Sequence, residues 1–229
     1  MPSKPNENTV AQATFAPFRL VWRLLSATML LWFVSCVIQI AYIHWRHVDP
    51  VTHIQDQLEY YTGDSASHGL AVQMGTVTFE HLIERWKLHR WKPNKPVTAA
   101  GETSVAPMIK RGIWASFQAE IETTIYNTVL FAAKLGVALG LIPLYLTWLF
   151  AFGMDGLVQR YIRRACGGYE SASIYHRAKL YGTRLLPPFA AVVFMCSPIP
   201  ISALLIFGPV ALFSALLVRL QATYYKKYL

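Results

Sequence analysis

The sequence predicts an all-α, polytopic membrane protein with four transmembrane helices, an extracytoplasmic helical loop and a basic cytoplasmic helical hairpin. The first observation is that residues 185–218 form a run of 34 residues without a charged side chain. A charged side chain costs roughly 2.5–3.5 kcal/mol at the centre of a bilayer helix. The second is composition: hydrophobic residues make up 54% and charged residues 14%, against about 25% charged in soluble domains. Both indicate lipid surroundings.

The third observation is the distribution of basic charge. Residues 1–23 carry a net +2, residues 155–184 a net +4 and residues 219–229 a net +3, whereas residues 46–122 carry −1. Short segments rich in lysine and arginine stay in the cytoplasm. We therefore expect a membrane protein whose residues 1–23, 154–184 and 219–229 face the cytoplasm, which agrees with four spans because an even number puts both termini on the same side.

The first span is expected at residues 24–45, after a cytoplasmic tail of residues 1–23. The apolar run 24–43 has 20 residues, more than the roughly 7–15 of a cleavable secretory signal. A helix of that length covers the roughly 30 Å of the hydrocarbon core. The segment should therefore remain as an anchor.

Residues 46–124 are expected to form the extracytoplasmic loop. Asp49 followed by Pro50 is typical of a helix start, and a second helix is expected over residues 66–91, before a linker at 93–107. Three histidines lie at the start of this region, but structural zinc usually needs four well-placed ligands. We expect neither metal nor cofactor; the histidines in question are His44, His47 and His53.

The second span is expected at residues 125–153. Its small residues recur every four positions, and such a face lets a neighbouring helix approach closely, within the chain or between copies of it. This helix-packing seam consists of Ala132, Gly136 and Gly140. Lys134 lies near the outer end of the span. Because lysine readily extends its amine to the interface, we expect it there, or paired with Glu120 or Glu122.

The last apolar stretch is expected to cross twice, at residues 182–197 and 200–220, before a cytoplasmic tail of residues 221–229. A single straight helix of 34 residues would extend about 51 Å, which is too long for the core. Pro198 and Pro200 lie in the middle of the stretch and favour a break there. A re-entrant hairpin is the alternative.

The cytoplasmic loop, residues 154–181, is the most distinctive segment. Arg160, Arg163 and Arg164 share a helix face, Gly167-Gly168 favours a stop, and a second basic helix follows. Basic residues here could bind anionic headgroups, an acidic protein or nucleic-acid phosphates, or only maintain orientation. The expected docking residues for a partner or lipid are Arg160, Arg163, Arg164, Glu170, Tyr175, His176, Arg177 and Lys179.

The string RRACGGYESASIYHRAK at residues 163–179, after Asp155-Gly156, resembles the integrating conjugative element membrane protein family. That family has no assigned biochemical activity. Its genes commonly neighbour the gene of the TraD-type coupling protein, the ATPase that delivers DNA to a conjugative type IV secretion channel. The resemblance implies an accessory protein of conjugation in the bacterial inner membrane, with membrane lipids and the coupling protein or other channel subunits as partners.

We therefore expect a non-enzymatic component without direct contact to DNA. An enzyme is disfavoured because Ser171 and His176 lie on different helix faces and no nucleophile-elbow or phosphate-loop motif is present. A small transporter or channel subunit is the alternative, and it would need polar residues along an interior path. Its candidate residues are Gln39, Asn127, Lys134 and Thr147.

Overall fold

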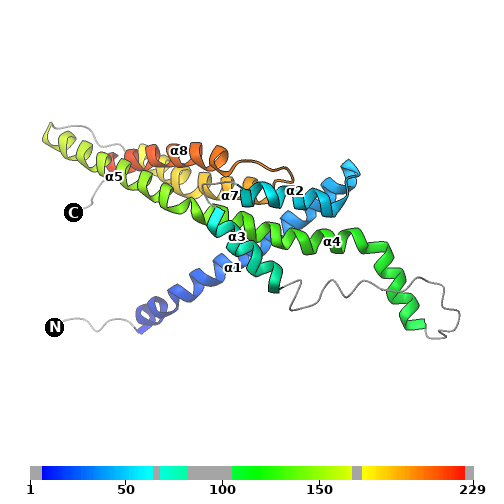
Figure 1. The fold of residues 1–229 in the computed structure, drawn as a ribbon. Coiled ribbons are helices and arrows are strands. Elements are labelled where there is room, and N and C mark those ends of the chain that lie inside the picture. The colour runs from blue at the N-terminus through cyan, green and yellow to red at the C-terminus, as the bar shows by residue number, and fades with distance from the viewer. Residues whose placement is uncertain (1–6, 64–67, 82–104, 167–171, 225–229) are drawn as a thin grey trace.

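A computed structural model describes residues 7–63, 68–81, 105–166 and 172–224, and every element in these ranges is helical. This confirms the all-α prediction. Figure 1 shows the arrangement of the elements. The elements are α1 (Glu7–Arg46), α2 (Pro50–Gly63), α3 (His68–Phe79), α4 (Val105–Gly140), α5 (Ile142–Ala165), α6 (Ala172–Lys179), the π-helical turn η3 (Leu180–Leu185), α7 (Leu186–Cys196) and α8 (Ala203–Tyr224).

Among the described residues, three stretches are long and apolar enough to cross a membrane: Val21–Arg46 in α1, Glu120–Ala165 across α4 and α5, and Ala203–Tyr224 in α8. The prediction of a fourth span falls on residues 182–197. There α7 has only 11 residues, but it continues without interruption from α6 through η3. Residues 172–196 therefore form one helical run that is basic in its first half and apolar in its second.

The predicted second span falls on two helices. α4 ends at Gly140 and α5 begins at Ile142, with Pro143 in the first turn of α5. Proline lacks the N–H of a helix interior and is tolerated at a helix start. The combined stretch of 46 residues would extend about 69 Å, more than twice the hydrocarbon core. Only part of it can therefore lie in lipid.

The helices α5, α7 and α8 lie side by side in Figure 1, and the beginning of α1 and the end of α8 point toward the same side of the molecule. Two glycines permit close packing on α8. A Cβ on Gly156 would lie 2.5 Å from the Arg219 carbonyl oxygen, and one on Gly182 would lie 2.8 Å from the Leu217 Cβ. Asp155 and Arg219 form an ion pair beside this contact.

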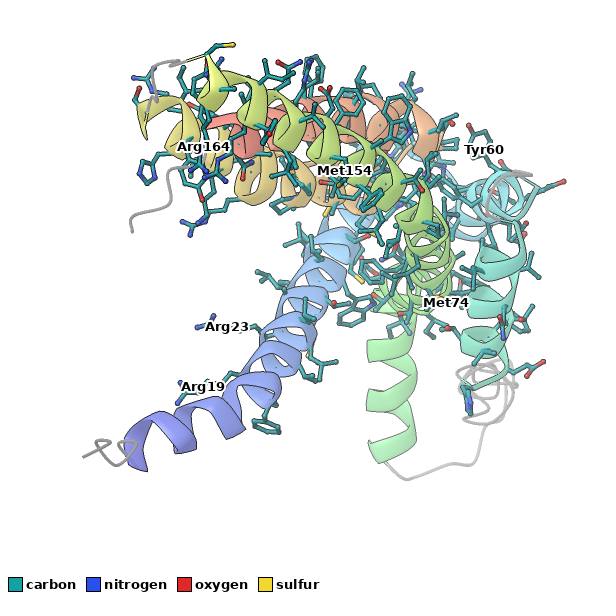
Figure 2. All side chains as sticks on the ribbon, turned by 90° about the vertical axis from the view of Figure 1, so that its left-hand side faces the viewer. Arg19, Arg23, Tyr60, Met74, Met154 and Arg164 are labelled. Atoms are coloured by element: carbon teal, nitrogen blue, oxygen red, sulfur yellow. The ribbon has the colours of Figure 1, made fainter. Side chains whose placement is uncertain are left out.

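The second half of α1 packs on the other described helices. Trp32 Nε1 donates to Thr128 Oγ1 of α4 at 3.1 Å, and Ser35 Oγ donates to the Met195 carbonyl oxygen of α7 at 3.2 Å. The first half extends away from these helices (Figure 2). The described apolar side chains of this half are open, with Trp22 65% and Leu25 60% exposed, as expected for a helix surrounded by lipid.

The short helices α2 and α3 cover the outer part of α4. α1 ends at Arg46, and His47 directly after it has a left-handed φ of 52°. Asp49 then caps α2, since the Thr52 N–H donates to its Oδ2 at 3.0 Å, and this hydrogen bond lowers the pKa of Asp49. The helix start predicted from Asp49 and Pro50 is thus confirmed, and α2 is positioned over the turn between α7 and α8.

Candidate functional site

Lys134 is the main departure from the sequence-based prediction. The residue is only 1% exposed, and its Nζ donates to the Ser197 carbonyl oxygen at 2.7 Å. The ammonium group also lies 5.4 Å from the centre of the Tyr61 ring. The predictions of an interfacial lysine and of pairing with Glu120 or Glu122 were wrong. Glu120 instead faces His44, at 3.4 Å between Oε1 and Nε2.

Residues 197–202 form the turn that joins α7 to α8, and α2 binds it through side chains. Gln57 Nε2 donates to the Pro198 carbonyl oxygen at 2.9 Å, while the Ile201 N–H donates to the Tyr61 hydroxyl oxygen at 3.1 Å. Within the turn, Ser197 Oγ donates to the Ile199 carbonyl oxygen at 2.7 Å, but Pro198 and Pro200 have no N–H, so the Ser197 and Pro198 carbonyl oxygens take donors from other helices. We call Gln57, Tyr61 and Lys134 the turn clamp, because they supply the missing partners from α2 and α4.

A second set of buried polar side chains lies next to the turn clamp. Asn127 Nδ2 donates to Ser35 Oγ at 3.4 Å and to Cys36 Sγ at 3.2 Å. Gln39 Nε2 donates to Gln57 Oε1 at 3.5 Å. Among the candidate channel residues, Gln39, Asn127 and Lys134 are thus brought into one interior region. Thr147 is exposed on α5 and donates to the Pro143 carbonyl oxygen of its own helix at 2.9 Å.

His53 lies at the edge of the turn clamp, where its protonation state affects the hydrogen bonds of Gln57 and Pro198. Its Nε2 is 2.9 Å from Gln57 Nε2 and 3.1 Å from the Pro198 carbonyl oxygen, and its ring stacks on Tyr42 with centroids 5.1 Å apart. Burial lowers the pKa of His53 below its ordinary 6.5, against a smaller opposing effect of the Pro198 hydrogen bond and Asp56; Lys134 contributes to the lowering. Neutral imidazole can accept the Gln57 N–H, whereas imidazolium cannot.

We therefore expect the free energy of unfolding to fall as the pH drops below about 6.5. The folded state binds fewer protons at His53 than the unfolded state does, so stability is highest above the unfolded pKa and decreases toward the lowered folded pKa. Thermal unfolding at pH 8 and pH 5 measures the difference, and His53→Gln should reduce it. An equal drop in His53→Gln would show that other groups cause it.

The basic residues that the sequence predicted to dock a partner lie at the opposite end, around the ends of α5, α6 and α8. Arg163 is already engaged: its guanidinium lies 4.1 Å from the centre of the Tyr224 ring, and its Nη2 donates to the Tyr224 hydroxyl oxygen at 3.0 Å. Arg160 is half-buried. Glu170 lies outside the described residues, as does Ser171 of the disfavoured catalytic pair.

The exposed members of this set come from two helices. Arg164 extends from the end of α5 (Figure 2). On α6, the exposed side chains are His176, Arg177 and Lys179. Tyr175 is half-buried, with its ring 5.3 Å from that of His176 and 5.9 Å from Lys179 Nζ. The described part of this surface therefore presents cations on both α5 and α6.

Of the three residues in the predicted packing seam, Gly136 closely approaches another helix of the same chain. A Cβ there would lie 2.6 Å from the Leu70 carbonyl oxygen of α3, while Ala132 and Gly140 are half-buried. Sequence reasoning missed Gly156 and Gly182, which make the equivalent close approach to α8. The sequence did contain a signal for them. Each glycine lies near one end of the basic loop within a predicted helix, and helix interiors usually avoid glycine.

In the described ranges, no three histidine, cysteine or acidic side chains gather as a metal site would require. The described cysteines are free, with Cys36 and Cys196 buried and Cys166 exposed. The candidate sites are therefore the buried turn clamp at one end and the cationic surface at the other, joined by α8.

Comparison with known families identifies the chain. Residues 81–226 match the model of a family described as IncC plasmid conjugative DNA transfer protein DtrJ-like, which is more than half of the sequence. The chain belongs to the DtrJ-like family. No curated protein and no solved structure matches it. The DtrJ-like region contains α4 to α8, and so both Lys134 and the predicted docking residues, whereas α1, α2 and α3 precede it.

The DtrJ-like assignment gives this protein a role in conjugative DNA transfer. It confirms the link to conjugation that the loop at residues 163–179 implied. The matching family is named for a plasmid transfer system, whereas the resemblance of the loop was to proteins of integrating elements. Three apolar helices of spanning length are compatible with a membrane location.

Proposed function

We propose that this protein is a non-enzymatic accessory component of the conjugative apparatus in the bacterial inner membrane, and that it docks the coupling protein on its cytoplasmic side. The observation that carries the proposal is the cationic surface. Arg164 on α5 and His176, Arg177 and Lys179 on α6 are all exposed. The ion pair between Asp155 of α5 and Arg219 of α8 marks the end of the apolar part of these two helices. The exposed basic residues lie beyond that ion pair.

For a component of the conjugative apparatus, we expect this cationic surface to bind an acidic protein and not DNA. The coupling protein carries the DNA itself, so the accessory component needs only to hold that protein at the membrane. Complementary charge accelerates encounter and fixes orientation, and each basic residue near an anionic membrane adds about 1 kcal/mol of attraction. Membrane lipids are thus a second partner of the same residues.

Neutralising Arg164, Arg177 and Lys179 together, each to glutamine, should lower the conjugation frequency of donor cells by about tenfold or more, since complementary surface charge typically changes association rates by 10–10³. Arg163 is left unchanged because its contact with Tyr224 supports the fold. Mating assays measure the effect, and immunoblots of membrane fractions measure insertion. Arg46→Gln is the control, because Arg46 is also exposed but lies at the end of α1, away from this surface. Donor cells with this variant should transfer DNA normally. A normal frequency in the triple variant would exclude the docking surface.

A transporter or channel subunit is the second candidate, favoured by one observation. Gln39, Asn127 and Lys134 are buried together, and the Oε1 of Gln39 has no hydrogen-bond partner among the described residues. Ion flux into proteoliposomes that disappears in Lys134→Ala would support this function, whereas an absence of flux in the unchanged protein would leave only the accessory role.

A further inference from the structure

The part of α5 beyond Asp155 carries an apolar surface that the rest of the described chain does not cover. Leu157, Val158, Tyr161 and Ile162 follow one face of the helix, and we call them the α5 end patch. Tyr161 is 77% exposed and Ile162 is 50% exposed. Large apolar side chains that remain this open, next to exposed cations, mark interaction sites in soluble surroundings.

The position of the patch along α5 separates it from the apolar face that precedes it. Asp155 and Arg219 form an ion pair in which both side chains are partly exposed, 46% and 39%. Charged groups are excluded from the hydrocarbon core, so the ion pair marks the inner limit of that core. Before it, the same face carries Phe150, which is 72% exposed, as expected for a residue in contact with lipid.

Beyond the ion pair, α5 continues to Ala165, which adds about 15 Å of helix. The headgroup region on each side of the bilayer is only about 5–7 Å thick. Tyr161 is six residues past Asp155 and so about 9 Å beyond the core limit, and Ile162 about 10 Å. A typical helix tilt of about 20° changes these values little. The Cα positions of Tyr161 and Ile162 therefore lie at or past the outer edge of the headgroups, whereas Leu157 and Val158, two and three residues past Asp155, lie at headgroup depth.

The charges around the patch define what would bind it. Arg164 is exposed and borders the patch, because position 164 is one helix turn after Tyr161. Arg177 and Lys179, exposed on α6, carry the same sign. The other face of α5 is covered by α8, since Arg163 stacks on Tyr224. An incoming segment would therefore need apolar anchors for the patch and acidic residues for Arg164.

We propose that the α5 end patch binds an acidic amphipathic segment of a protein partner, with Tyr161 and Ile162 as apolar anchors and Arg164 as the pairing cation. The proposal rests on the proposed function and deepens it, because it states the chemistry of the segment that the docking surface accepts. Tyrosine and arginine are the residue types that most often dominate the binding energy of an interface. The basic residues of α6 would steer the partner toward this contact.

Photo-crosslinking in donor cells tests the proposal on the full chain. A photoreactive phenylalanine analogue replaces Tyr161, and a matched variant carries it at Phe150 on the same face of α5. We expect a covalent protein adduct at position 161 and none at position 150. Arg164→Glu should reduce the adduct at least tenfold, which corresponds to a loss of about 1.4 kcal/mol, whereas Arg164→Lys should retain most of it.

The outcomes separate the surface from its proposed partner. An adduct that depends on Arg164 and contains the coupling protein supports both. An Arg164-dependent adduct with a different acidic protein supports the α5 end patch and contradicts the coupling protein as partner. The patch is overturned by lipid adducts alone at position 161, by an adduct with a second copy of this chain, by an adduct that Arg164→Glu leaves unchanged, or by no adduct.

Discussion

Lys134→Ala should lower the free energy of unfolding by about 3 kcal/mol or more. The substitution removes a buried hydrogen bond from a charged group, worth about 1.5–3 kcal/mol, and leaves the Ser197 carbonyl oxygen without the donor that now lies at 2.7 Å. It also removes the packed stem of a side chain that is 1% exposed, and comparable truncations of buried methionine or leucine cost about 2–5 kcal/mol. Unfolding in mixed detergent micelles, followed by circular dichroism, measures the loss.

Lys134→Met is the matched control, because methionine keeps most of the stem and loses only the ammonium group. Its loss should be clearly smaller than that of Lys134→Ala, since burying an ammonium without a carboxylate partner also carries a desolvation cost. Equal stability of Lys134→Ala and the unchanged protein would contradict the role of the turn clamp. A Lys134→Met variant as unstable as Lys134→Ala would assign the whole effect to the hydrogen bond.

The position of Lys134 also shows where reasoning from the sequence ends. Local patterns correctly predicted an all-α chain, a helix starting after Asp49 and a link to conjugation, because each depends on neighbouring residues or on one short string. The partner of Lys134 lies 63 residues away along the chain. Periodicity and hydropathy describe the faces of a helix, but they do not say which other segment covers a face.

Two further differences have different physical origins. The bend between α4 and α5 had a local signal in Pro143, since proline is favoured in the first turn of a helix. The division of the basic residues had none: Arg163 contacts Tyr224 across 61 positions, while Arg164 beside it stays exposed. The sequence could therefore indicate a cationic loop without separating the arginine that supports the fold from the one that is open to a partner.

Gly136→Ala should lower the free energy of unfolding by about 1–3 kcal/mol, although alanine is the better helix former by about 1 kcal/mol. The added Cβ would lie 2.6 Å from the Leu70 carbonyl oxygen and 2.9 Å from the Ala71 Cα. Both are backbone atoms, so no side chain can rotate away and α3 as a whole must shift. Overpacking of this kind typically costs about 1–3 kcal/mol.

Gly69→Ala is the control, because it lies on α3, the helix that Gly136 approaches, and a Cβ there meets no atom of the described residues within 4 Å. It should be neutral or slightly stabilising. Denaturation of both variants in the same micelles gives the comparison. If Gly136→Ala were as stable as Gly69→Ala, the close approach of α3 to α4 would be absent in the protein. A loss of stability in Gly136→Ala alone would show that α3 supports the fold. If donor cells with this variant still transfer DNA normally, the docking surface acts independently of α3.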